Sequence, residues 1–176
     1  MRIVAGTLKG RRLQGPASDD VRPTSDRLRE TLFNVLGARV RGSRVLDAFA
    51  GTGAVGLEAI SRGAVHVTFY ESDAQAWQVA EANIRSLGVG ALCEMIRTDF
   101  LKSKGGADCD LVFLDPPYDD GDLNAVLRVA GTHATQGGVI VLEHRRSRET
   151  PPVEGSLVRT RVLLSGDSAL SFYSAN

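Results

Sequence analysis

Apolar and polar positions alternate along residues 45–142 in a rhythm of short apolar runs and longer segments with helical spacing. The short runs are rich in β-branched and aromatic residues, and they predict five strands at residues 45–49, 65–70, 92–97, 111–114 and 139–142. Apolar residues recur every three or four positions between these runs and predict three helices at residues 55–61, 74–87 and 123–130. Strands that alternate with helices indicate right-handed βαβ units and a parallel sheet.

Both ends of the chain depart from this rhythm. Residues 157–164 and 169–173 predict two strands joined by a tight turn, so the sheet is expected to end in an antiparallel hairpin. Residues 1–20 predict a small basic β-hairpin extension, which a helix with its N-cap at Thr24 or Ser25 follows. We therefore expect an α/β, Rossmann-like domain at residues 21–176, with the extension in front of it.

Charge is distributed unevenly, although the 176 residues hold 21 Lys and Arg and 21 Asp and Glu. Residues 1–44 contain ten basic and four acidic residues, a net charge of +6, so the rest of the chain carries −6. Such an asymmetry fits contact with a nucleic acid, and it fits a solvated basic face equally well.

Composition also sets expectations about the compartment. Cys93 and Cys109 lie in apolar runs, which is typical of buried free thiols in a reducing compartment. No run approaches the roughly 18 apolar residues of a membrane span, and the N-terminus has no signal-peptide pattern. We expect a cytoplasmic protein with no membrane partner. The scattered His66, His133 and His144 show no ligand spacing, so we expect no metal.

A glycine-rich turn follows the first predicted strand, where ligands bind at the carboxyl edge of parallel sheets. Gly51, Gly53 and Gly56 satisfy G-x-G-x-x-G, which by itself is a weak indication of a nicotinamide or flavin dinucleotide. Asp47 stands just before the turn, where its charge would repel a pyrophosphate and attract a ligand with an ammonium group.

Two further polar positions follow the next strands. Glu71 ends the second strand about 20 residues past the glycines, the usual place for an acceptor of two ribose hydroxyls. Asp99 and Phe100 follow the third strand, where a carboxylate accepts from an adenine amine and a ring stacks or packs. Taken alone, Phe100 is interpreted as a core residue.

The fourth strand runs directly into Asp115, Pro116, Pro117 and Tyr118. Two prolines fix the backbone and remove two N–H donors, so the carbonyl oxygens are left as acceptors beside the carboxylate. Such acceptors suit an exocyclic amino group, because they take both of its hydrogens and make its nitrogen more nucleophilic. Tyr118 offers a ring on which a planar base can stack.

These motifs together resemble class I S-adenosylmethionine-dependent methyltransferases that modify amino groups. The front of the chain narrows the resemblance, through MRIVAG from Met1, KGRRL from Lys9 and RPTSDRLRETLFN from Arg22. It is similar to the bacterial RsmD family, which methylates guanine N2 in the 16S ribosomal RNA of the small subunit. The resemblance covers nearly the whole chain and implies the class I methyltransferase fold, S-adenosylmethionine as cofactor, and RNA of the assembling small subunit as partner. We also expect a monomer.

The resemblance also implies a role for each matching position. Cofactor contacts are implied for Thr24, Asp47, Ala48, Gly51, Gly53, Glu71, Ser72, Asp99 and Phe100. A catalytic loop that holds the target guanine is implied for Asp115, Pro116, Pro117 and Tyr118. RNA contacts are implied for Arg2, Lys9, Arg11, Arg12, Arg22 and Arg27. Arg145 and Arg146 follow the fifth strand at the same edge, where phosphate contacts and a plain surface cluster are equally good interpretations. Arg22, Thr24 and Arg27 fit the cofactor carboxylate or the RNA entrance equally well.

Other functions remain open at this point. A DNA methyltransferase acting on adenine N6 or cytosine N4 would use a similar loop, and protein glutamine methyltransferases carry Asn at the position of Asp115. Cytosine-C5 chemistry needs a nucleophilic cysteine, which this loop lacks. A non-enzymatic RNA-binding module that keeps only the fold is a further alternative, which the complete Asp115 loop disfavours.

Overall fold

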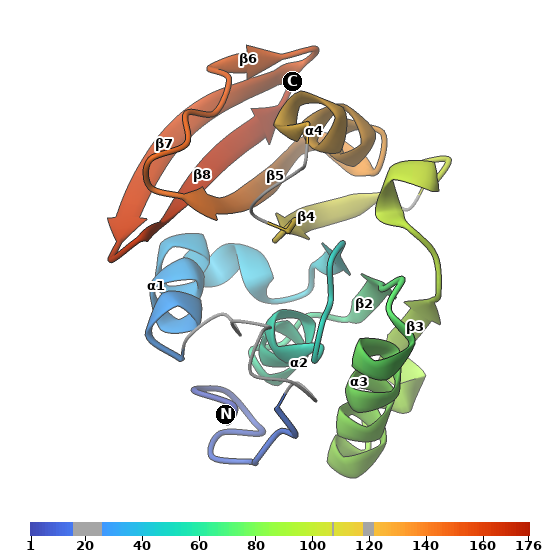
Figure 1. Ribbon diagram of the computed structural model, residues 1–176. Coiled ribbons are helices and arrows are strands. Elements are labelled where there is room, and N and C mark those ends of the chain that lie inside the picture. Colours follow the sequence, from blue (N-terminus) through green and yellow to red (C-terminus); the bar gives the residue numbers. More distant parts are fainter. Residues whose placement is uncertain (16–25, 107, 118–121) are drawn as a thin grey trace.

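The computed structural model describes residues 1–15, 26–106, 108–117 and 122–176. One eight-stranded sheet runs through it in the order β3-β2-β1-β4-β5-β8-β7-β6 (Figure 1). Its strands are β1 (Arg44–Asp47), β2 (His66–Tyr70), β3 (Cys93–Ile96), β4 (Cys109–Leu114), β5 (Ala134–Arg145), β6 (Val153–Glu154), β7 (Leu157–Ser165) and β8 (Ser168–Ala175). The helices are α1 (Asp26–Leu36), α2 (Ala54–Ser61), α3 (Ala74–Leu87) and α4 (Leu123–Gly131), with short 3₁₀ turns η1 (Gly37–Val40), η2 (Gly90–Leu92) and η3 (Phe100–Lys102).

The sheet is parallel from β3 through β5 and antiparallel beyond. This arrangement confirms the expected α/β fold with a mostly parallel sheet that ends in an antiparallel hairpin. Strands β1 and β4 are buried on both faces, since neighbouring residues of each strand belong to different core clusters. Solid apolar runs at these strands are therefore explained by helices on both sides of the sheet.

Each face of the sheet has its own helices. The face that includes Val45 and Phe113 packs against α1, α2 and α3, and the face that includes Leu46 and Leu114 packs against α4 and η3. Side chains of a strand alternate between faces, so consecutive residues of one strand serve different clusters. None of the helices in the described residues is long and apolar enough to cross a membrane.

Helix α3 shows why the sequence predicts some boundaries well. It begins after Asp73, whose carboxylate accepts from the backbone N–H groups of Gln75 and Ala76. It ends at Gly88, whose φ of 72° is the left-handed conformation that glycine adopts without strain. Both signals lie next to the helix in the sequence, and the predicted range of residues 74–87 is confirmed.

Some predicted boundaries are wrong for physical reasons. Strand β5 spans 12 residues, although only residues 139–142 were expected. Its first residue pairs with Cys109, and its last pairs with Ser168 of β8, so sheet partners extend it beyond its apolar run. The short strand β6 was not predicted, and β1 ends at Asp47, where the chain turns into the β1–α2 loop (residues 48–53).

The N-terminal segment (residues 1–14) lies against α2 and α3 (Figure 1). The expected hairpin has one bridge, between Arg2 and Arg12, and no regular strands among its described residues. Ile3 and Leu13 are buried in the same cluster as α1 and α2. Buried Glu58 of α2 also accepts from the N–H groups of Val4 and Ala5, at 2.7 and 3.0 Å. The segment is therefore packed against the main body.

Two glycines of this segment form a matched test of that packing. Gly6 and Gly10 have φ values of +85° and +82°, but a Cβ on Gly6 would lie 1.9 Å from the Ser61 carbonyl oxygen, and one on Gly10 would meet nothing within 4 Å. Gly10→Ala is expected to lower the free energy of unfolding by about 1–2 kcal/mol through backbone strain alone. Gly6→Ala is expected to lower it by roughly 3 kcal/mol or more, because the backbone clash is added. Urea denaturation measures both losses, and equal losses would contradict this docking.

Candidate active site

Acidic side chains gather where the parallel strands end. Asp47 is the last residue of β1, and its sheet partners are Phe69 of β2 and Phe113 of β4. Glu71 and Asp115 each lie two residues beyond these partners. Since strands rise about 3.3 Å per residue and lie about 4.8 Å apart, these three carboxylates are brought to one short stretch of the sheet edge.

Asp47 is an unusual carboxyl group because it is only 2% exposed. Burial raises its pKa from the ordinary 3.8 to about 7, the N–H of Gly56 that it accepts at 3.0 Å lowers the pKa, and the charge of Glu71 raises it. In the ionised form this carboxylate is a buried negative charge at the carboxyl edge of the sheet. A cationic group of a ligand placed beside it would be strongly favoured.

Glu71 holds the β1–α2 loop in place. Its two carboxylate oxygens accept from the N–H groups of Gly51 and Asp73, each at 2.8 Å. A carboxylate has about four acceptor positions, so these two bonds orient Glu71 and leave capacity for two hydroxyl donors. Ser72, between Glu71 and the cap of α3, is exposed.

The loop itself brings backbone to the sheet edge. Gly51 and Gly53 have φ values of +53° and +76°, which side chains rarely allow, and a Cβ on Gly51 would meet nothing within 4 Å. Gly56, in contrast, is tightly packed, because a Cβ there would lie 2.3 Å from a ring carbon of Phe69. Ala48 is buried and donates its N–H to the Phe113 carbonyl at 3.0 Å. Gly56, the third glycine of the motif, serves the close packing of α2 against β2.

Asp99 and Phe100 follow β3 and begin η3. The Asp99 carboxylate accepts from the N–H of Leu101 at 3.0 Å and caps this turn. Phe100 is 1% exposed, and its ring contacts Phe49 and Tyr70 edge-on, with centroids 5.6 Å apart in both pairs. This burial favours the interpretation of Phe100 as a core residue.

The loop after β4 begins with half-buried Asp115, buried Pro116 and exposed Pro117. It leaves the sheet at the same edge as Glu71 and Asp47. Tyr118, which was expected to stack on the target base, lies outside the described residues. Arg22 and Thr24, which were expected to contact the cofactor or RNA, also lie outside them.

Sequence reasoning missed one acidic residue of this edge. Val141 of β5 is the sheet partner of Phe113, and Glu143 lies two residues further, level with Asp115. Glu143 is 3% exposed and lies on the same face as Val141. An acid directly after the apolar run at residues 139–142 was the available signal, and the shorter predicted strand left it outside the sheet.

The basic residues expected to contact RNA form two groups on the surface. Arg2, Lys9, Arg11 and Arg12 are exposed in the N-terminal segment, and Arg27 is exposed on α1. Of these side chains, Arg2 lies 3.8 Å from the Asp26 carboxylate, and Arg11 donates to the Ser86 carbonyl at 2.7 Å. Arg145 and Arg146 are exposed where β5 ends, at the carboxyl edge that also carries Asp115.

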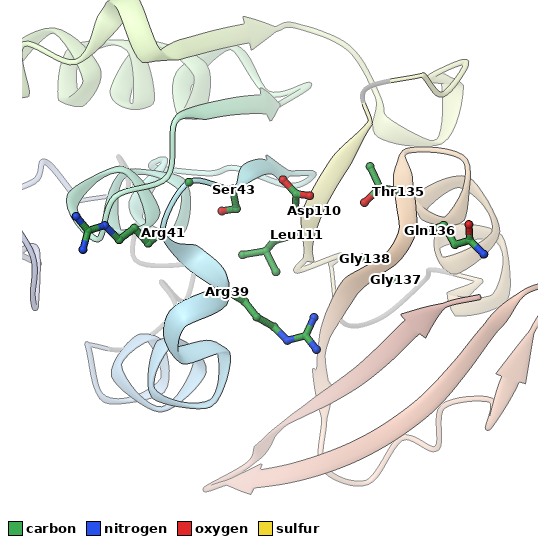
Figure 2. A pocket seen from close by; sticks show the side chains of 10 residues that line it. Arg39, Arg41, Ser43, Asp110, Leu111, Thr135, Gln136, Gly137 and Gly138 are labelled. Atoms are coloured by element: carbon green, nitrogen blue, oxygen red, sulfur yellow. The ribbon is translucent and has the colours of Figure 1, made fainter.

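A cavity of about 280 Å³ lies at the opposite edge, where β1, β4 and β5 begin (Figure 2). Two of its polar side chains make hydrogen bonds that serve the fold. Asp110 accepts from the N–H of Arg44 at 2.8 Å, and the Ser43 hydroxyl donates to the Val40 carbonyl at 2.7 Å. Parallel sheets bind ligands at the carboxyl ends of their strands, so the acidic edge is the stronger candidate for the active site.

Neither a metal cluster nor a reactive thiol is found among the described residues of this edge. In the described ranges, no group of three His, Cys, Asp or Glu side chains is arranged to hold a metal ion. Burial raises the pKa of both Cys93 and Cys109 to about 11, with nearby Arg44 lowering that of Cys109, so both remain neutral thiols. Among the described residues, the acids and the backbone of the β1–α2 loop are the groups that this edge offers to a ligand.

S-adenosylmethionine fits these groups by its chemistry. Its ammonium and sulfonium centres suit buried Asp47, its two ribose hydroxyls suit Glu71, and the open backbone at Gly51 leaves room beside them. A pyrophosphate would place two negative charges near Asp47 and Glu71, which would repel it. The observed edge therefore favours a cationic nucleoside over a dinucleotide.

Known proteins resemble the chain over its full length. Ribosomal RNA small subunit methyltransferase D from Escherichia coli K12 is 34% identical over 177 residues, covering 98% of this chain and 89% of that protein. The solved structure of yhhF from Escherichia coli superposes with a TM-score of 0.88 at 32% identity, covering 100% of this chain and 98% of that one.

A third likeness concerns the fold alone. The 16S rRNA N2 G1207 methyltransferase RsmC of Thermus thermophilus, solved with AdoMet and guanosine, has a TM-score of 0.70 at 24% identity, covering 91% of this chain and 45% of that one. A family model described as Conserved hypothetical protein 95 matches residues 1–174. The relatives are named as ribosomal RNA methyltransferases, and the family model covers nearly the whole chain. The chain therefore belongs to this family, the RsmD family.

Proposed function

We propose that this protein transfers a methyl group from S-adenosylmethionine to the N2 amine of a guanine in 16S ribosomal RNA. The observation that carries the proposal is the loop of Asp115, Pro116 and Pro117, which leaves β4 level with Glu71. Asp115 lies two residues beyond the β4 partner of buried Asp47. The names of the relatives support ribosomal RNA as the substrate class, and the carboxylate of the loop supports an amino group as the target.

Cofactor binding is assigned to the β1–α2 loop and its neighbours. Asp47 would balance the positive charge of the methionine end, with the backbone of Ala48, Gly51 and Gly53 beside it. Glu71 would accept from the ribose hydroxyls, supported by Ser72. Asp99 would accept from the adenine amine, and Phe100 would support this site from the core. Thr24 is a proposed contact from outside the described residues.

The chemistry needs alignment more than proton transfer. When bound, S-adenosylmethionine supplies a methyl group already activated by its sulfonium. The Asp115 carboxylate and the Pro116 carbonyl would accept hydrogen bonds from the two N–H groups of the amine and direct its lone pair. Positive charge develops on the amine during transfer, and Asp115 would stabilise it in place. The methyl–sulfur bond would break as the new N–C bond forms, so that S-adenosylhomocysteine is left, and the extra amine proton would pass to solvent water. Tyr118 would hold the base by stacking.

RNA binding is assigned to the two basic groups. Exposed Lys9, Arg12 and Arg27 lie on the side of α1 and the N-terminal segment, and Arg145 and Arg146 lie beside the catalytic edge. Arg2, Arg11 and Arg22 complete the proposed set. Phosphates of RNA would contact such a surface without regard to sequence. We further propose that the protein acts as a cytoplasmic monomer on the assembling small subunit.

The decisive experiment compares ribosomal RNA from cells with and without the gene. Nuclease digestion and mass spectrometry are expected to show the loss of one N2-methylguanine from 16S RNA. Purified protein and labelled S-adenosylmethionine are expected to restore it on small subunits from the deletion strain. An unchanged set of methylated nucleotides, together with no transfer in vitro, would contradict the proposal.

A further inference from the structure

The N-terminal segment and the β1–α2 loop meet at one buried side chain, Asn83 of α3. Asn83 is 1% exposed. Its amide nitrogen donates to the carbonyl of Thr52 in the loop at 2.9 Å and to the carbonyl of Gln14 in the segment at 3.1 Å. Its amide oxygen accepts from the N–H of Gln14 at 2.7 Å. Three hydrogen bonds therefore connect two segments that lie far apart in sequence.

Other neighbours hold the loop as well, because Ala48 and Ala50 donate their N–H groups to the carbonyls of Phe113 and Tyr70, at 3.0 and 2.9 Å. Gly51 donates to Glu71 from one side, and Thr52 contacts Asn83 from the other. The Thr52 hydroxyl also donates to the sulfur of Met1 at 3.9 Å, a second contact between the loop and the N-terminal segment. Both ends of the segment thus reach the loop, since Met1 and Gln14 flank the bridge between Arg2 and Arg12.

The other contacts of the segment lead elsewhere. Glu58 and Ser61 of α2 hold residues 4–8, with Ser61 accepting from the N–H of Leu8 at 3.0 Å. These bonds fix the segment to the body, and none of them involves the β1–α2 loop. Among the described residues, the hydrogen bonds that link the segment to the loop run through Asn83 and Met1. An amide with both donors engaged has a narrow range of orientations, so displacement of Gln14 also disturbs the bond to Thr52.

We propose that Asn83 is a positioning residue that couples RNA binding at the basic N-terminal segment to cofactor binding at the β1–α2 loop. This inference rests on the proposed function, because it uses the cofactor and RNA assigned above. RNA that fixes Gln14 in the bonded position would hold Thr52 and the loop ready for the cofactor. By linkage, the cofactor would strengthen RNA binding by the same factor.

The coupling is measured with S-adenosylhomocysteine, which binds without reacting. Its dissociation constant is determined with and without saturating small subunits from cells that lack the gene. The ratio of the two constants is expected to be about five or more in the unmodified protein, within the usual range of allosteric coupling. Asn83→Ala is expected to bring the ratio to about one, because both sets of bonds are lost.

Two matched variants separate coupling from stability. Gln14→Pro removes the backbone N–H that donates to the Asn83 amide oxygen, and Gln14→Ala keeps it. Because the Gln14 side chain is exposed, its loss is the same small change in both variants. The proline variant is expected to lose the coupling and the alanine variant to keep it. Ser61→Ala loosens the same segment at α2 and is expected to keep the coupling despite a lower melting temperature.

The outcomes also separate this inference from the proposed function. A protein that binds both ligands with a ratio of one, or a Gln14→Pro variant with an unchanged ratio, overturns the coupling alone. A protein that binds neither S-adenosylhomocysteine nor subunits overturns the proposed function, and the coupling with it. Loss of the ratio in Gln14→Pro and Asn83→Ala, with retention in Gln14→Ala and Ser61→Ala, supports the coupling.

Discussion

Asp115→Asn is expected to reduce the rate of methyl transfer by about 10²-fold or more, with cofactor affinity nearly unchanged. The substitution keeps the size of the side chain at the start of the loop after β4. It removes the negative charge that would stabilise the amine as the amine becomes cationic. It also places the NH₂ group of Asn, a hydrogen-bond donor, opposite the N–H groups of the target amine. Because that charge exists only in the transition state, the loss falls on kcat.

The same strand supplies a matched control. Asp110 lies at the amino end of β4, exposed at the opposite edge of the sheet, where it accepts from the N–H of Arg44. Asp110→Asn makes the same chemical change and is expected to leave kcat unchanged. Single-turnover transfer to undermethylated small subunits, with S-adenosylhomocysteine binding measured in parallel, compares the two variants. Near-normal turnover by Asp115→Asn would place the catalytic centre elsewhere.

Local signals explain which parts of the fold could be predicted from the sequence. Residues 111–114 of β4 form an apolar run buried on both faces, and α3 carries its own cap and stop at Asp73 and Gly88. Each of these features depends on residues within a few positions. The carboxyl-edge site follows in the same way, because Asp47, Glu71 and Asp115 stand directly after or at the ends of buried strands.

Features that depend on distant partners could not be predicted. Glu58 lies within α2, and nothing beside it shows that it accepts from Val4, 54 positions away. Asn83 likewise reads as an ordinary polar residue of α3, although its partners are Gln14 and Thr52. The full extent of β5 depends on pairing with β8, so Glu143 was left outside the predicted strand. The docked N-terminal segment and the fourth acid emerge only from tertiary contacts.

Asp47→Asn is expected to stabilise the ligand-free protein at high pH. Burial raises the pKa of Asp47 from 3.8 to about 7, so the folded state holds this proton more tightly than the unfolded chain does. The stability that this proton gives is complete below pH 3.8 and is lost as the pH rises to about 7. The loss amounts to roughly 2–4 kcal/mol in the free energy of unfolding at pH 8. Asn retains an oxygen that can accept from Gly56 and has no charge to bury, so its stability is expected to change far less between pH 5 and 8.

Cofactor binding by the same variant is expected to change in the opposite direction. S-adenosylmethionine would bind the ionised form of Asp47, so a protein below pH 7 must first release a proton. The affinity of the unmodified protein is therefore expected to rise about tenfold from pH 6 to 7.5, since each unit below the pKa costs about a factor of ten. Asp47→Asn is expected to bind about 10- to 100-fold more weakly at pH 7.5, because a hydrogen bond to a charged group is lost.

Titration of the ligand's own amine is common to both proteins, so the difference between their pH profiles in calorimetry isolates Asp47. A variant that is more stable at pH 8 and still binds with the pH profile of the unmodified protein would show that the buried charge at the end of β1 serves no ligand. Gain of stability together with loss of the pH-dependent affinity would show that the fold keeps an unfavourable charge at this edge because the cofactor needs it.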